Sequence, residues 1–419
     1  MRTPWRTLAL LAALALPLAG QDRLELSGSC RSFSILLLPP AWRTNGAAPQ
    51  EADMAAVNNR LRIHFCFQAS GGLSLDAAYD LSPRIQDSRF FDPDDWLPGI
   101  EAPGYRCVDF SPRLYPGPGA RAESFALFHN LDRLCLTLKL KFADVFLGRQ
   151  ALAWGSARII NPTDVIAPFG FNELDAEERR GVDALRVRVP LGRMDELDLG
   201  VVAGENFAEE KSAFFLRGKT YLWKTDLSLL LMAFREHLLV GFDLSRSLGG
   251  AGIWLELAHV SDHFFSSDPP EGNGYFRASL GLDASFRNGW YAFCEYHCSS
   301  AGAARAEEYL SLPASAARRD GSVYLLGRHY LGAGMSKTLT GLVTSSALLL
   351  ANLGDTSLIL SPQLEYNIAE DIYIAAGAYL GLGKKPERDP DPSAEEPILL
   401  HSEFGAYPDT LYASFRIYF

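Results

Sequence analysis

The sequence predicts an all-β fold, a transmembrane antiparallel up-and-down β-barrel of about 18 strands. Three observations predict this fold: stretches in which apolar and polar residues alternate, very short connections that alternate with long polar ones, and a final segment that alternates up to a terminal phenylalanine. About 20 candidate strands can be marked, including 105–114, 121–129 and 132–141, but the early ones alternate weakly. Because bacterial single-chain barrels have even strand numbers, we expect roughly 18 strands, within a range of about 16 to 20.

The alternation has the period of a β-strand. In residues 134–142, Leu and Phe side chains occupy one face, whereas Cys135, Thr137, Lys139 and Lys141 occupy the other. A soluble antiparallel sheet with one wet face also alternates. The alternating segments are about ten residues long, however, which is the length that a tilted strand needs to cross the hydrocarbon layer. The length therefore favours a membrane barrel.

The connections between these segments fall into two classes. Some consist of a few residues, namely 71–72, 192–196, 249–250, 288–289 and 370–371. Others are long and polar, namely 38–58, 82–104, 154–181, 262–273, 300–322 and 382–408. Outer-membrane barrels have this asymmetry, with tight periplasmic turns at one end and long external loops at the other. The connections thus predict the same fold as the alternation.

Residues 411–419 form an alternating segment that ends in an aromatic residue. Phe415, Ile417 and Phe419 lie on its apolar face, and Arg416 lies on its polar face. This segment resembles the C-terminal strand of bacterial outer-membrane barrels. The resemblance implies that Phe415, Ile417 and Phe419 act as an assembly signal, with the barrel assembly machinery and periplasmic chaperones as partners.

Residues 1–20 have the features of a secretory signal peptide. Arg2 and Arg6 precede a short apolar run, which small residues follow. We therefore expect residues 21–419 to form a single barrel in the outer membrane of a diderm, Gram-negative-type bacterium. Beyond residue 20, no stretch approaches the roughly 18 consecutive apolar residues of a membrane helix, which excludes a helical membrane protein.

Charge and cysteine content argue against other classes. The formal net charge is −11 and becomes −13 when the two arginines of the signal peptide are removed, which argues against nucleic-acid binding. The six cysteines are spread along the chain, and we interpret them mostly as isolated thiols. Cys294 and Cys298 alternate with Glu295 and His297, so a strand would place the two pairs on opposite faces. We expect no metal site and no cofactor.

One segment resembles a known class of proteins. Its matching residues are Gly148-Arg149-Gln150, Trp154-Gly155, Asn161-Pro162-Thr163-Asp164 and Arg180-Gly181-Val182-Asp183-Ala184. Together they are similar to a segment shared by porin-like and alginate-export-type outer-membrane barrels. The resemblance implies a channel for the passive diffusion or export of small polar solutes, without fixing the solute.

Residues 154–181 are too long and too rich in turn-forming residues to be a strand. Pro162 and Pro168 interrupt any strand because proline has no amide donor. The segment nevertheless contains six large apolar residues, Ile159, Ile160, Val165, Ile166, Phe169 and Phe171. A fully solvated loop has little use for them, so we hypothesise that the segment folds into the lumen as a constriction loop. Its expected constriction residues are Trp154, Arg158, Asn161, Asp164, Glu177 and Arg180. The alternative is an external loop that packs on its neighbours.

Charged residues of the alternating strands are expected to face the lumen. An arginine that faced lipid near the middle of the bilayer would cost about 2–4 kcal/mol. The expected channel-lining residues are Arg60, Arg62, Lys139, Lys141, Arg186, Arg188, Arg217 and Lys219, against fewer acidic residues, which include Glu256 and Glu295. The basic excess favours anionic or carboxylated solutes.

The acidic residues of the 154–181 segment suggest a further hypothesis about this lumen. If they lay opposite Arg186, Arg188, Arg217 and Lys219, the two sets would create a transverse field that screens solutes by charge. The alternative is that the charges pair with one another and stiffen the barrel.

The sequence contains no motif of a barrel-embedded hydrolase. Gly-x-Ser-x-Gly, His-Glu-x-x-His and Gly-x-x-x-x-Gly-Lys are all absent, so we do not expect an enzyme. The alternative function is a surface-assembly or adhesin-type barrel whose long outer loops bind polysaccharide or a protein partner. Conduction in a planar bilayer would separate the two functions, because an adhesin-type barrel would be plugged. Outer-membrane lipid and small polar solutes are the expected partners, and a homo-oligomer is compatible with the sequence.

Overall fold

The computed structural model of the protein describes residues 23–40, 53–69, 71–91, 104–117, 120, 122–168, 170–171, 173–265, 274–314, 323–388 and 398–419. The expected signal peptide at residues 1–20 lies outside these ranges, as does Phe169 of the expected constriction loop. Strands dominate the described residues. Among these residues, no helix has the length and apolar character of a membrane span.

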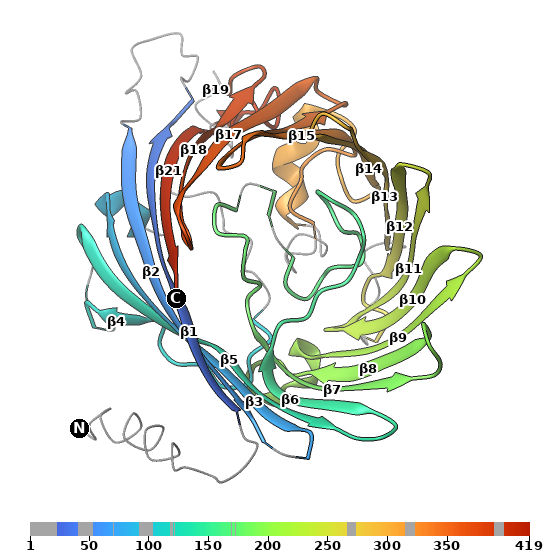
Figure 1. Ribbon diagram of the computed structural model, residues 1–419. Helices are drawn as coiled ribbons and strands as arrows, with labels where there is room; N and C mark the ends of the chain where they lie inside the picture. The colour runs from blue at the N-terminus through green and yellow to red at the C-terminus, as the bar shows by residue number, and fades with distance from the viewer. Residues whose placement is uncertain are drawn as a thin grey trace.

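Eighteen long strands form a closed antiparallel barrel (Figure 1). The main sheet has 19 strands, and 18 remain when the three-residue β4 (Arg113–Tyr115), which pairs with β5, is set aside. The barrel strands are β1 (Arg23–Leu38), β2 (Met54–Gln68), β3 (Leu73–Gln86), β5 (Phe125–Lys139), β6 (Asp144–Gln150), β7 (Val182–Pro190), β8 (Glu196–Val202), β9 (Ala213–Leu222), β10 (Thr225–Phe234), β11 (His237–Leu248), β12 (Ala251–Ser261), β13 (Tyr275–Ser285), β14 (Trp290–Ser299), β15 (His329–Thr340), β16 (Val343–Asn352), β17 (Ser357–Ala369), β18 (Ile372–Leu382) and β21 (Asp409–Tyr418). β1 pairs with both β2 and β21, which closes the ring. The predicted fold class and strand number are confirmed.

Two early parts of the strand prediction are wrong. Residues 121–129 and 132–141 do not form two strands, because most of both segments belongs to the single strand β5. Segment 105–114 is not a barrel strand, and strand structure within it is confined to the first two residues of β4. Local alternation could not show either fact, because the pairing of a strand depends on partners that lie far away in the chain.

The outward face of the barrel is apolar. On β5, Leu134, Leu136 and Leu138 have exposed fractions of 44%, 40% and 38%, whereas the intervening Cys135 is 6% exposed. Such an exterior is unfavourable in water and favourable against acyl chains. The closed ring also pairs the strand backbones with one another, which a sheet within a bilayer requires. Both properties identify a membrane-spanning barrel.

Short connections occur where the sequence predicts them. β11 and β12 are joined by Gly249 and Gly250, and β17 and β18 are joined by Glu370 and Asp371. Gly249 and Asp371 have positive φ values of 65° and 59°, as the tight turns of hairpins require. Successive connections of an antiparallel barrel lie at alternate ends, and the long connections all lie at one end. That end also has short ones, such as residues 235–236 between β10 and β11.

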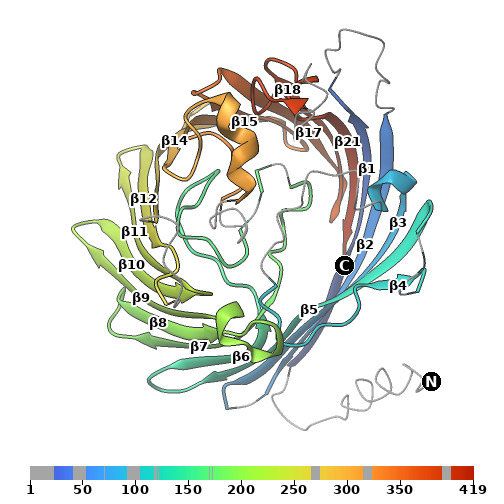
Figure 2. The same ribbon diagram turned by 180° about the vertical axis from the view of Figure 1, so that it is seen from behind.

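Residues 151–181, the connection between β6 and β7, pass inside the ring of strands in both views (Figures 1 and 2). We refer to them as the inner segment. The 3-10 helix η5 (Ala306–Ala314) also projects into the ring (Figure 1). Apolar residues of the inner segment are buried there: Ile160, Val165 and Ile166 have exposed fractions of 2%, 1% and 1%.

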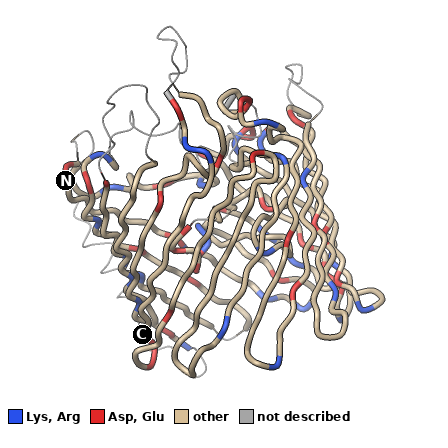
Figure 3. The backbone as a smooth tube through the Cα atoms, turned by 90° about the horizontal axis from the view of Figure 1, so that it is seen from above, with Lys and Arg blue, Asp and Glu red and all other residues tan. Residues whose placement is uncertain are grey.

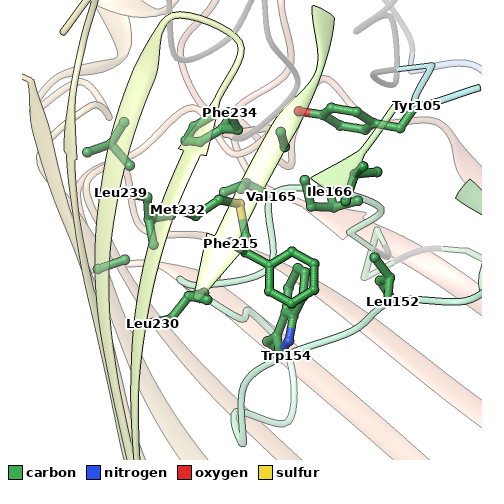
Figure 4. Close-up of a cluster of buried hydrophobic side chains, with 14 of the residues drawn as sticks. Tyr105, Leu152, Trp154, Val165, Ile166, Phe215, Leu230, Met232, Phe234 and Leu239 are labelled. Atoms are coloured by element: carbon green, nitrogen blue, oxygen red, sulfur yellow. The ribbon is translucent and has the colours of Figure 1, made fainter. Parts of the chain in front are cut away.

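Two hydrophobic clusters join the inner segment to the barrel wall. In the first, Trp154 packs against Phe215 of β9 with ring centroids 4.9 Å apart (Figure 4). The segment also contributes Leu152, Val165 and Ile166 to this cluster, and the wall contributes Leu230, Met232, Phe234 and Leu239. The second cluster surrounds Ile160 and contains Leu325, Tyr330, Leu350, Ile359 and Phe404. The interior of the barrel therefore has a packed side and a polar side.

Candidate channel lining

The first half of the inner segment is bound by a carboxylate of the wall. Glu256 of β12 is fully buried and accepts hydrogen bonds from the backbone N–H groups of Ser156, Ala157 and Thr163 at 3.1, 3.2 and 2.7 Å. The hydroxyl of Thr163 donates to the same carboxylate at 2.7 Å. Gly155, at φ +100°, allows this approach, because a Cβ atom there would lie 2.5 Å from the Glu256 carboxylate.

A second wall carboxylate binds the neighbouring residues. Glu295 of β14 is 2% exposed and accepts the backbone N–H groups of Arg158, Ile159 and Ile160 at 2.6, 3.1 and 3.1 Å. The indole N–H of Trp254 donates to it at 2.9 Å. The two glutamates therefore satisfy backbone donors that would otherwise be buried without partners.

The second half of the inner segment is bound by ion pairs. Asp175 lies 2.7 Å from both Arg31 of β1 and Arg60 of β2. Glu177 lies 3.0 Å from Arg31 and 2.6 Å from Arg416 of β21. A third acid of the segment, Glu178, lies 3.5 Å from Arg62 and 3.8 Å from Arg133. The acidic residues thus face the wall formed by β1, β2, β5 and β21.

These ion pairs match the alternative hypothesis, in which charges pair with one another, and the transverse field across the lumen stays a prediction. Arg186, Arg188, Arg217 and Lys219 pair with none of Asp175, Glu177 and Glu178 and have neighbours of their own on the wall. These neighbours are Asp198 for Arg186 at 2.6 Å, Asp144 for Arg188 at 4.0 Å, Ser228 for Arg217 at 3.3 Å and Asp226 for Lys219 at 3.9 Å. Alternation assigns a face to a strand residue but does not show which part of the wall a crossing segment meets.

The remaining expected wall residues differ in their burial and in their position on the barrel. Arg62 is 5% exposed and lies 3.1 Å from Asp80 and 2.9 Å from Asp132. Lys139 is the exposed last residue of β5. Lys141 is not on the wall, which corrects the prediction, because the strand has ended and Leu140 bonds to Ala143 across a turn. The charged residues of the strands are visible along the barrel in Figure 3.

The expected constriction residues divide into buried and exposed ones. Trp154 is buried against Phe215, and Asp164 is 1% exposed and pairs with Arg179 of the same segment. Burial raises the pKa of Asp164 to about 6, although the Arg179 guanidinium acts in the opposite direction. These two side chains therefore stabilise the conformation of the inner segment.

The other expected constriction residues lie closer to open space. The half-exposed Arg158 side chain pairs with Asp283 at 2.9 Å and lies over the Trp254 ring. Glu177 and Arg180 are exposed, and the partly buried Asn161 accepts the backbone N–H of Asp164 at 3.3 Å. Arg158, Glu177 and Arg180 are therefore the members of the set whose side chains are exposed in the structure.

A polar cavity of about 540 Å³ lies between the second half of the inner segment and the wall. Arg60, Arg84, Asp109, Glu173 and Arg180 are among the residues that line it. Within the described ranges, neither Arg84 nor Arg180 has a carboxylate within salt-bridge distance, whereas Arg60 is shared between two aspartates. Arg84 instead lies over the Phe128 ring, 4.6 Å from its centroid.

Sequence reasoning missed several residues of this lining. It placed Glu256 and Glu295 on the inner face, but it did not indicate that they bind the backbone of the 156–163 stretch. It also missed Arg31 and Arg84. Arg84 follows Pro83 at the end of β3, and an alternation count extended through that proline would have found it. Nothing in the sequence around Glu256 or Glu295 marks their partners, because backbone N–H groups carry no side-chain signature.

Comparison with known proteins shows the fold. No protein-family model matches the sequence, and no curated protein matches it. Solved structures do match over nearly the whole chain. The outer membrane protein OpdK of Pseudomonas aeruginosa superimposes with a TM-score of 0.55 at 8% identity, covering 95% of this chain and 98% of its own.

Two further solved structures give the same result. OccK9 (OpdG) of Pseudomonas aeruginosa has a TM-score of 0.55 at 12% identity, covering 94% of this chain and 98% of its own. OccAB3 of Acinetobacter baumannii has a TM-score of 0.54 at 10% identity, covering 94% and 99%. The chain therefore has a porin-like fold, and with its closed ring and apolar exterior it is a β-barrel of the outer membrane.

Proposed function

We propose that the protein is a passive channel for small polar solutes, that the 154–181 segment narrows its passage, and that anionic or carboxylated solutes pass preferentially. The observation that carries this proposal is the polar cavity beside the inner segment, which presents the guanidinium groups of Arg84 and Arg180 without carboxylate partners among the described residues. Guanidinium groups bind carboxylates through paired, charge-assisted hydrogen bonds.

The arrangement of charges supports selection by sign. Arg31, Arg60 and Arg62 are already bound by Asp175, Asp80 and Asp132, so their charges are largely balanced locally. Of the charged residues of the cavity without a salt-bridge partner among the described residues, the two arginines outnumber the one acid, Glu173, so the field that a small solute experiences there is positive on balance. An anion gains attraction at this point, whereas a cation does not.

Channel activity is tested by adding the refolded barrel to planar bilayers and to liposomes. We expect stepwise conductance, and swelling of the liposomes with small polar solutes, faster for carboxylates than for cations of equal size. A barrel that inserts but neither conducts nor admits solutes would contradict the channel and would favour the alternative, a surface-assembly or adhesin-type barrel.

Selectivity is tested with the double substitution Arg84→Glu and Arg180→Glu. We expect the anion-to-cation permeability ratio, measured from the reversal potential in a salt gradient, to fall by about tenfold. The matched control is Arg193→Glu, because Arg193 is exposed in the tight turn between β7 and β8. Equal ratios in the double variant and the control would contradict the assignment of the cavity.

A further inference from the structure

We infer that Glu256 and Glu295 are positioning residues that hold the 156–163 stretch against the wall and thereby set the width and steadiness of the passage. This inference rests on the proposed channel function. Neither glutamate is assigned to contact solute. Each acts through the backbone of the inner segment, whose other half lines the polar cavity.

The two carboxylates act at one level of the barrel wall. Glu256 of β12 lies opposite Ser279 of β13, and the Ser279 hydroxyl donates to the carbonyl of Ile160 at 2.7 Å. Glu295 of β14 lies opposite Gly281, two residues further along β13. Three successive strands therefore present polar groups to the same short stretch of chain.

The carboxylates and the stretch depend on each other. Six backbone N–H groups, those of residues 156–160 and 163, donate to the two carboxylates. In the described part of the chain, neither Glu256 nor Glu295 has a basic side chain within salt-bridge distance. Without the stretch, two buried carboxylates would lose most of their donors, and without the carboxylates the stretch would leave its N–H groups unpaired.

This mutual dependence favours two discrete positions of the stretch. In the docked position all six backbone N–H groups have carboxylate partners, whereas in a released position both the N–H groups and the carboxylates need water as their partner. A position between the two satisfies neither side, because hydrogen bonds weaken steeply with distance and angle. The stretch consequently behaves as an element that is either bound or free, and the two glutamates bias it towards the bound position.

The docked position is also closely packed. Thr163 lies against Gly241 of β11, where a Cβ atom would be 2.7 Å from the Thr163 methyl group. With Thr163 in place, a side chain at position 241 would push the stretch away from the wall. When Thr163 is replaced as well, its methyl group is gone, and the two positions suit an engineered disulfide, which joins Cβ atoms about 3.5–4.5 Å apart.

The first test replaces the acceptors and measures current. In the double variant Glu256→Gln and Glu295→Gln, each side chain keeps one acceptor oxygen and presents an NH₂ group to N–H donors. We expect the mean single-channel conductance to rise by about twofold or more and to fluctuate between levels. The matched control is Asp76→Asn, which removes a carboxylate that pairs with His64 on another part of the wall. Steady conductance of wild-type size in the double variant would overturn the inference.

The second test restores the docked position by another bond. Thr163→Cys and Gly241→Cys are added to the double Gln variant, and oxidation should return the conductance to the wild-type level and steadiness. Reduction should release it again, whereas the same reductant should leave the double Gln variant without the cysteine pair unchanged. An oxidised channel that still fluctuates would show that the glutamates act by some route other than position, and would overturn the inference.

A third measurement does not depend on conduction. Hydrogen exchange of the purified barrel should show protected amides at residues 156–160 and 163, and about tenfold faster exchange there in the double Gln variant. A wild-type barrel that does not conduct would refute the proposed channel. Hydrogen exchange would still test the positioning role of the two glutamates in that case. Unchanged protection in the double Gln variant would refute the positioning role even in a conducting channel.

Discussion

The inner segment is bound to the barrel in two different ways on its two sides. Towards β12 and β14, its backbone N–H groups donate to two buried carboxylates, and its apolar side chains pack into closed clusters. Towards β1, β2 and β21, its acidic side chains pair with arginines beside a polar cavity.

The difference shows how one connection can serve two purposes. Backbone hydrogen bonds in a dry environment fix position, because an unpaired buried donor is costly. Ion pairs beside a polar cavity determine which charges face that cavity, and their net contribution to stability is small because the two charges lose water when they pair. In the proposed channel, the packed side accordingly positions the segment, and the polar side selects the solute.

The largest expected effect on stability comes from breaking the packed side. Trp154→Ala should lower the free energy of unfolding by about 3–5 kcal/mol, because it removes a buried indole and leaves a cavity beside Phe215. Urea-induced unfolding of the barrel in detergent measures this loss. Arg158→Ala, which removes a half-exposed side chain of the same segment, should cost less than about 1 kcal/mol. A similar loss in both variants would contradict the distinction between the two sides.

An intermediate effect, on ion selectivity, is expected from removing an ion pair on the polar side of the inner segment. Asp175→Asn should remove one of the carboxylates that Arg31 and Arg60 each contact, and so raise the anion-to-cation permeability ratio by roughly threefold. Reversal potentials at low and high salt measure the effect, which should shrink at high salt because screening shortens the reach of charges. Glu370→Gln, in the tight turn between β17 and β18, is the matched control. A ratio that falls would show that the aspartate does not mask these arginines.

The smallest effect is expected on the wall away from the segment. Arg186→Glu together with Arg188→Glu should raise cation preference by less than about threefold, because Arg186 is already paired with Asp198 and neither arginine contacts the inner segment. The measurement is again the reversal potential, with each single substitution as its comparison. A shift larger than that of Arg84→Glu with Arg180→Glu would move the selective region from the cavity to β7.

Much of the fold could be predicted from the alternation of apolar and polar residues, which repeats every two residues. In strands such as β5 and β12, apolar and polar residues alternate because one face contacts lipid and the other faces the interior. The local sequence is therefore enough to predict that these strands exist. Segment 105–114 was misread because pairing is a property of two strands, and the sequence of one strand does not reveal its partner. The closure of β1 on β21 was likewise beyond local reasoning.

The candidate site was less predictable than the fold. The apolar residues of the 154–181 segment led to the hypothesis that it enters the lumen, but the part of the wall that it meets depends on how the whole ring curves. The acids at 175–178 therefore pair with arginines of β1, β2, β5 and β21 rather than with those of β7 and β9. The partners of Glu256 could not be found either, since they are main-chain atoms.

The distance along the chain between the inner segment and its glutamates has a consequence for the order of assembly. Ser156 precedes Glu256 by 100 residues, and Arg158 precedes Glu295 by 137 residues. The segment cannot dock until β12 and β14 have joined the sheet, and contacts between such distant residues form late. We therefore expect the proposed passage to acquire its final width only after these two strands have joined the sheet.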